Sequence, residues 1–151
     1  MSVMEKFEKV CEKTRRFAPI PLRLALGIIF TYHGHGKVFG GVPGFAESLG
    51  RMGMEPALPL AWLTALTEFL GGIALILGFL TPVAASGLAI TMIVAITRVH
   101  WTRGLSGPGG YEFPLSLLAG ALALLLGGPG CPAVDCFLKK CCKCRPGHPP
   151  S

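Results

Sequence analysis

The chain has 151 residues, of which 51% are hydrophobic and 15% are charged, and its mean hydropathy is +0.57. A soluble domain carries about 25% charged residues, so this composition argues against an ordinary soluble domain. It predicts an all-α, multi-spanning membrane protein with no room for a second folded unit. The net charge of +6 comes mostly from the two ends, which is typical of topology signals and lipid contacts. The sequence contains no motif that reads bases, so nucleic-acid binding is not predicted.

Residues 1–16 predict an amphipathic lead-in on the cytoplasmic side. Apolar residues recur there at helical spacing and charged residues fill the other face, a pattern that fits a short helix in the membrane interface. A solvated, charged approach to the first span is the alternative. The stretch is not typical of a cleavable signal peptide, because no small-residue cleavage site follows the first apolar run.

Four hydrophobic segments predict a membrane four-helix bundle within residues 17–130. The second segment is apolar on every face and is long enough to cross a bilayer, which takes ~20 residues. A second interfacial helix is expected near residues 45–54, with Phe45, Leu49 and Met52 on one side of it, and a tight turn is expected at Thr81–Pro82. The spans are expected at about residues 19–36, 57–80, 83–99 and 112–127.

Basic residues are distributed unevenly between the two ends and the loops. Nine lie outside the spans at the ends, against four in the connections after spans one and three. Cytoplasmic segments carry the excess of Lys and Arg, so both termini are predicted to be cytoplasmic in a cell-membrane protein. The nine are Lys6, Lys9, Lys13, Arg15, Arg16, Lys139, Lys140, Lys143 and Arg145.

A carboxylate stands near the middle of the second span, at Glu68. A charge at that depth costs roughly 2.5–3.5 kcal/mol on insertion scales, so it is rarely without a role. Glu68 either belongs to a ligand or proton pathway or forms a structural ion pair with Arg23. Arg23 lies about one turn inside the first span and alternatively reaches back to the lipid head groups.

With this topology, a group of polar residues gathers near the outer face. It comprises His33, His35, Lys37, Arg98, His100, Arg103 and Glu112. The basic members are either interfacial anchors or part of a site. The spacing of His33 and His35 does not place them on one helical face, and no C-x-x-C-H motif supports haem binding, so no metal site is predicted.

The tail, residues 131–151, is rich in Cys, Lys and Pro. Three interpretations of its cysteines are open: reduced thiols in the cytosol, reversible palmitoylation beside the membrane, and a weak match to a zinc site.

Motifs recur on all four spans, over roughly residues 18–137. They are Arg23-x-Ala25-Leu26-Gly27-x-x-Phe30, His33-Gly34-x-x-Lys37, Glu68-Phe69-x-Gly71-Gly72, His100, Glu112-Phe113-Pro114-Leu115 and Gly128-Pro129-Gly130 followed by Asp135. Together these motifs resemble the DoxX family of small four-span membrane proteins. One departure is Ala133, where the family often has a serine two positions before the aspartate.

The resemblance implies a membrane subunit linked to thiosulfate:quinone oxidoreductase or to an assembly that handles thiol or oxidative stress. A quinone and a partner oxidoreductase are then expected, because the chain shows no flavin, haem or iron–sulfur motif. The candidate catalytic residues are Glu68, His33 and His100, and the candidate substrate-binding residues are Arg23, Lys37, Arg98 and Glu112.

Two further functions are open: a non-catalytic scaffold or assembly subunit, and a conduit for a small solute or ion with Glu68 in the pathway. Small-residue faces on spans two and four permit a homo-oligomer.

Overall fold

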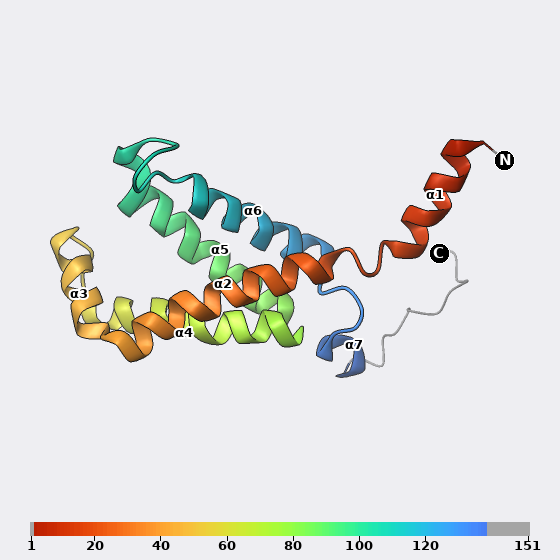
Figure 1. The fold of residues 1–151 in the computed structure, drawn as a ribbon. Coiled ribbons are helices and arrows are strands. Elements are labelled where there is room, and N and C mark those ends of the chain that lie inside the picture. Colours follow the sequence, from red (N-terminus) through yellow and green to blue (C-terminus); the bar gives the residue numbers. More distant parts are fainter. Residues whose placement is uncertain (1, 139–151) are drawn as a thin grey trace.

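The computed structural model describes residues 2–138, and the tail residues 139–151, with most of the cysteines discussed above, lie outside the described residues. Within residues 2–138 every regular element is a helix (Figure 1), which confirms the all-α prediction. The elements are α1 (Val3–Thr14), α2 (Pro19–Gly40), α3 (Val42–Arg51), α4 (Ala57–Leu77), α5 (Thr81–Val94), η1 (Ala95–His100), η2 (Trp101–Arg103), α6 (Glu112–Gly127) and α7 (Val134–Leu138).

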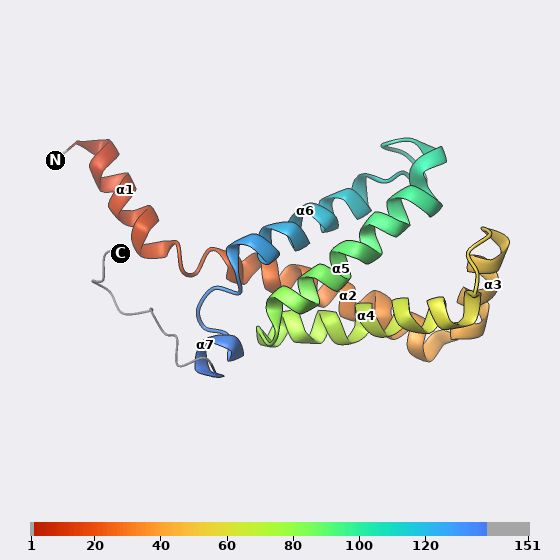
Figure 2. The same ribbon diagram turned by 180° about the vertical axis from the view of Figure 1, so that it is seen from behind.

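Two antiparallel helix pairs form the body of the protein. Helix α2 packs most extensively against α4, and α5 packs against α6. The pairs meet at the end where α4 turns into α5 and diverge toward the end that carries α3, as both ribbon views show (Figures 1 and 2). Buried side chains between them form the core: Leu26, Phe30, Leu75, Ala85, Leu88, Met92, Leu117 and Leu124.

Glycines set the close approach of α2 and α4. A Cβ atom on Gly34 would lie 2.6 Å from the backbone Cα of Phe69, and one on Gly72 would lie 2.6 Å from the hydroxyl of Thr31. Gly27 is similarly close to the backbone of α4. Small residues at helix crossings let backbones touch, so the crossing is fixed by where these glycines fall.

Two of the described helical stretches are long and apolar enough to cross a membrane: Ala57–Leu77 and Thr81–Arg103. Helix α6 is a shorter apolar helix of 16 residues. Helix α2 has 22 residues and spans about 33 Å at ~1.5 Å per residue. These lengths fit a membrane helical bundle, while the four-span topology itself remains a prediction.

Most helix boundaries differ slightly from those expected. Helix α2 continues to Gly40 and ends at Gly41, whose φ is +123°. Helix α4 ends at Gly78 in the left-handed conformation, and α5 begins at Thr81, so no separate Thr81–Pro82 turn exists. Only α6 occupies the expected residues 112–127.

The short helix after span one also lies earlier than expected. Helix α3 runs from Val42 to Arg51 and buries Val42, Ala46 and Leu49. Met52 follows the helix and is exposed, so it is not part of the buried face. Gly41 ends α2, and Pro43 is favourable in the first turn of a new helix. Helix α3 therefore begins earlier than expected.

The C-terminal segment closes the end of the bundle opposite α3. Asp135 on α7 accepts hydrogen bonds from the backbone N–H groups of Leu80 (2.7 Å) and Thr81 (2.9 Å). It thereby caps the start of α5 from a distant part of the chain. Cys131 is disulfide-bonded, contrary to the reduced state considered for it.

Helix α1 stands away from the bundle (Figures 1 and 2). A reciprocal cap joins Ser2 and Glu5 at its start. Its apolar side chains Val3, Phe7 and Val10 are exposed, as an interfacial helix requires. Helices α1 and α7 lie at the same end of the bundle (Figure 1), which an even number of crossings demands. Which side of the membrane this end faces remains a prediction.

Candidate functional site

Two cavities lie toward the α3 end of the bundle and meet at the same three polar residues. The loop cavity, of about 390 Å³, lies beneath the segment 104–111 between α2, α5 and α6. The lateral cavity, of about 520 Å³, lies between α3, α4 and α5. Both are lined by Lys37, Glu68 and His100, so these residues stand at the junction.

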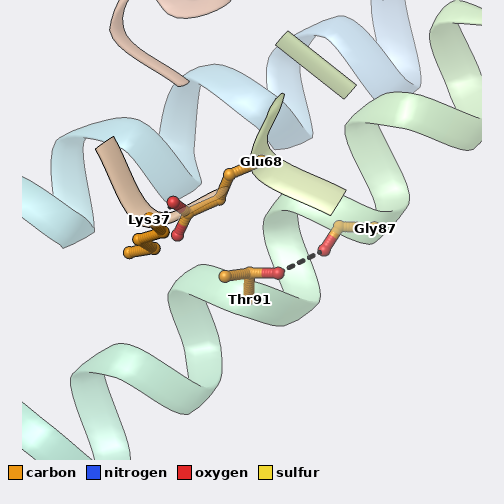
Figure 3. Close-up of polar contacts among 4 residues, drawn as sticks. All are labelled: Lys37, Glu68, Gly87 and Thr91. Atoms are coloured by element: carbon orange, nitrogen blue, oxygen red, sulfur yellow. Dashed lines mark hydrogen bonds and ion pairs between the residues drawn. The ribbon is translucent and has the colours of Figure 1, made fainter. Parts of the chain in front are cut away.

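An ion pair occupies the junction. The Lys37 ammonium donates to a carboxylate oxygen of Glu68, and Figure 3 shows the two side chains facing each other from α2 and α4. The Glu68 side chain is 4% exposed and that of Lys37 is 25% exposed. Glu68 is thus a buried anion whose counterion still reaches a cavity, which satisfies the need of a buried charge for a partner.

The helix crossing explains why Lys37 reaches Glu68. Gly34 touches the backbone of Phe69, the residue after Glu68. Lys37 lies three residues beyond Gly34, and residues three apart share a helix face. The motif His33-Gly34-x-x-Lys37 therefore places an ammonium beside the carboxylate through the contact at Gly34.

The aromatic ring of Phe45 forms a further wall of the junction. Its centroid lies 5.0 Å from the Lys37 ammonium, within the range of a cation–π contact. Phe45 comes from α3 and was expected only to bury an interfacial helix face. Sequence reasoning missed its role because the contact depends on how α3 folds back over α2.

His100 lies at the end of η1, the π-helical continuation of α5. Its Nδ1 lies 2.7 Å from the carbonyl oxygen of Gly109. A carbonyl only accepts, so Nδ1 carries the proton. In the neutral ring Nε2 is then left as a proton acceptor, which equips His100 for proton transfer at the junction.

Two more of the predicted residues, His33 and Glu112, line the loop cavity. His33 packs against Phe113, with ring centroids 6.0 Å apart. The segment above is folded tightly: Tyr111 N–H donates to the Gly104 carbonyl at 3.1 Å, and Trp101 stacks on the Tyr111 ring. His33 and Glu112 are exposed, so this cavity leads outward from the junction.

The expected pair between Arg23 and Glu68 does not form. Arg23 is buried at the opposite end, where its guanidinium donates to the carbonyl oxygens of Pro129 (2.9 Å) and Pro132 (3.0 Å). Arg98 is exposed and, like Arg23, lines neither of the two cavities in the described part of the chain. Sequence position gives the depth of a residue in a helix but not its partner, and Lys37 holds the carboxylate instead.

The remaining basic and histidine candidates also lie apart from the junction. The ring of His35 packs on Phe39, with centroids 4.7 Å apart, and Arg103 lies against the turn at Gly109. Among residues 2–138 no group of three His, Cys, Asp or Glu side chains is placed to hold a metal ion.

The assembled site combines a buried carboxylate, an ammonium and a tautomer-fixed imidazole between two cavities. It can donate hydrogen bonds from Lys37, accept or release a proton at His100, and place negative charge at Glu68. Such a set suits a ligand with carbonyl or hydroxyl groups on an otherwise apolar body.

Comparison with known proteins places the chain in a family. Residues 18–101 match the family model DoxX. The “Putative oxidoreductase CatD” of Bacillus subtilis is 33% identical over 130 residues, which cover 85% of this chain and 92% of that protein. No solved structure gives a significant match.

Two further relatives are membrane proteins. The “Inner membrane protein YqjF” of Escherichia coli is 32% identical over 78% of this chain and 89% of its own length. The “Uncharacterized membrane protein Rv3486” of Mycobacterium tuberculosis is 32% identical over 80% of this chain and 81% of its own length. The chain therefore belongs to the DoxX family of membrane proteins.

Proposed function

We propose that this protein binds the head group of a quinone at the Lys37–Glu68 pair and serves as a membrane subunit of a quinone-linked oxidoreductase. One observation carries the proposal: a buried carboxylate and its ammonium partner line two neighbouring cavities, and His100 lines both cavities as well. The name of the Bacillus subtilis relative, “Putative oxidoreductase CatD”, agrees with a redox role.

The residues at the junction fit the chemistry that a quinone supplies, which is the uptake of protons together with electrons. Lys37 donates a hydrogen bond to a carbonyl oxygen, and charge-assisted bonds of this kind are strong. His100 holds or moves a proton at Nε2, because Gly109 fixes the proton on Nδ1. Glu68 holds the ammonium in place and stabilises its charge. Electrons arrive from a partner oxidoreductase in the same membrane.

A titration in mild detergent tests this proposal. The purified protein is titrated with a short-chain quinone, and Kd is compared for the wild type, Glu68→Gln and Glu47→Gln. Glu47 is a matched control because it is an exposed glutamate on α3 that pairs with Arg51 of the same helix, at 3.6 Å, and lines neither cavity. Loss of the carboxylate at the junction is expected to weaken binding about tenfold, or ~1.4 kcal/mol, while Glu47→Gln leaves Kd unchanged. Absence of binding by the wild type, or equal Kd for both variants, contradicts the proposal.

A scaffold role is the second candidate, because the same ion pair ties α2 to α4. Exchanging the two residues, Lys37→Glu with Glu68→Lys, separates the candidates. A purely structural pair tolerates the exchange, so the assembled oxidoreductase keeps its activity. A directional site loses quinone binding although the protein still folds.

A further inference from the structure

The lateral cavity extends the site toward the side of the bundle. Its volume of about 520 Å³ falls within the ~300–1,000 Å³ typical of ligand pockets. The ionisable residues among those that line it are Lys37, Glu68 and His100. Most of the other lining residues are apolar, and they include Leu60, Leu63, Ile90 and Val94.

The outer walls of this cavity belong to the lipid-facing surface. Leu63 on α4 is 64% exposed, and Ile90 on α5 is 62% exposed. Both belong to the two helical stretches that are long and apolar enough to cross a membrane. Exposed aliphatic side chains on such helices meet acyl chains, so this side of the cavity faces the bilayer.

Thr91, a polar residue of α5 that lines this cavity, already has a hydrogen-bond partner within its own helix. The Thr91 hydroxyl donates to the Gly87 carbonyl of its own helix at 3.1 Å (Figure 3). Thr91 and Gly87 therefore present a wall whose hydrogen bonding is internal. An apolar chain lies against such a wall without leaving a buried donor unpaired.

We propose that the lateral cavity receives the apolar isoprenoid chain of the quinone, which enters sideways from the bilayer between α4 and α5. This inference rests on the proposed function, which places the ring at the Lys37–Glu68 pair. The match is one of composition: a quinone joins a polar head group to an apolar chain, and the cavity joins the Lys37–Glu68 pair to a lining that is mostly apolar. A phospholipid fits less well, because its phosphate would face the carboxylate of Glu68. The loop cavity is then left free for water and protons.

Photolabelling in lipid nanodiscs locates both parts of the ligand. Two quinones are used, one with a diazirine on the ring and one with it at the chain end, and the adducts are mapped by mass spectrometry. The ring probe is expected to label the region of Lys37 and His100. The chain-end probe is expected to label the α4–α5 side, at Leu63 and Ile90, and excess unlabelled quinone suppresses both.

A pair of matched variants sharpens the test. Thr91→Phe fills the cavity, whereas Ile93→Phe adds the same ring to an exposed position of α5 that does not line it. The added ring occupies volume that the chain would otherwise take, so Thr91→Phe is expected to reduce chain-end labelling about tenfold, equivalent to ~1.4 kcal/mol. Ile93→Phe leaves it unchanged. If Thr91→Phe does not fold, the labelling map of the wild type decides alone.

The outcomes separate the two proposals. Specific ring labelling with chain-end adducts on α2 or α6 overturns the lateral path but leaves quinone binding intact. Absence of specific ring labelling contradicts the proposed function itself. Labelling of the lateral cavity by a diazirine phospholipid that excess quinone does not displace assigns the cavity to a lipid and overturns the inference.

Discussion

Glu68 lies buried among apolar helices, and its charge is compensated by Lys37. An isolated carboxylate in that position would be protonated or would destabilise the fold. The pair instead keeps a charged group inside the bundle while one partner still reaches a cavity. A fully structural ion pair gains nothing from such access, so the partial exposure of Lys37 is the feature that favours a functional site.

Removal of one partner is expected to be worse than removal of both. Glu68→Leu or Lys37→Met leaves an unpaired charge, which costs about 3–5 kcal/mol at a fully buried site and less here because Lys37 is 25% exposed. The double variant is expected to recover most of the loss. Denaturant unfolding in detergent measures the cycle, and strictly additive losses would show that the two side chains do not interact.

A second prediction at the level of single residues concerns the tautomer of the His100 ring. The bond to the Gly109 carbonyl places the proton of the neutral ring on Nδ1. Nitrogen-15 NMR of the labelled neutral ring distinguishes the two tautomers directly. An Nε2–H ring would mean that the Gly109 contact does not hold in solution.

Five of the seven predicted site residues line the loop cavity: His33, Lys37, Glu68, His100 and Glu112. Depth along each span predicted that four of these lie near one another, because loops at one end of a bundle converge, but it placed Glu68 nearer the middle of the membrane. Partners could not be predicted in the same way. Arg23 and Lys37 stand at opposite ends of α2, and only the register between α2 and α4 decides which cation meets Glu68.

At the scale of helices, that register depends on the glycines of α2 and α4. Gly34 sits where any side chain would meet the backbone of Phe69. The sequence does not show which glycine between His33 and Lys37 makes the close approach. Gly34 and Gly36 look alike in the sequence, yet a Cβ on Gly36 meets nothing within 4 Å.

These two glycines make a matched experiment. Gly34→Ala is expected to push α2 away from α4 and to lower the free energy of unfolding by about 1–3 kcal/mol. Gly36→Ala is expected to be neutral or to stabilise the helix by up to ~1 kcal/mol. Thermal unfolding in detergent compares them, and equal stability of the two variants would contradict the observed crossing.

The start of α5 gives another test. Asp135 caps it from α7, so Asp135→Ala is expected to cost about 0.5–2 kcal/mol. Asp135→Asn is expected to cost less, since its amide oxygen still accepts one bond. Hydrogen exchange at Leu80 and Thr81 reports the cap locally, and unchanged protection in Asp135→Ala would show that other groups hold these amides.

Across the whole molecule the two ends of the bundle differ in kind. At one end, the C-terminal segment packs on Arg23, which donates to its carbonyl groups, and on the start of α5. The other end, with α3 and the segment 104–111, contains both cavities. The approximate positions of the long helices could be predicted from hydropathy, whereas this division could not, because it depends on contacts between residues far apart in the chain.

The most direct test of quinone binding is extraction of the protein itself. The wild type and Glu68→Gln are purified from membranes in mild detergent, and bound quinone is quantified after solvent extraction. Near-stoichiometric quinone in the wild type, and its loss in a folded Glu68→Gln, is the expected result. A well-folded wild type that retains no quinone, or a variant that retains as much as the wild type, would contradict a quinone site at the Lys37–Glu68 pair.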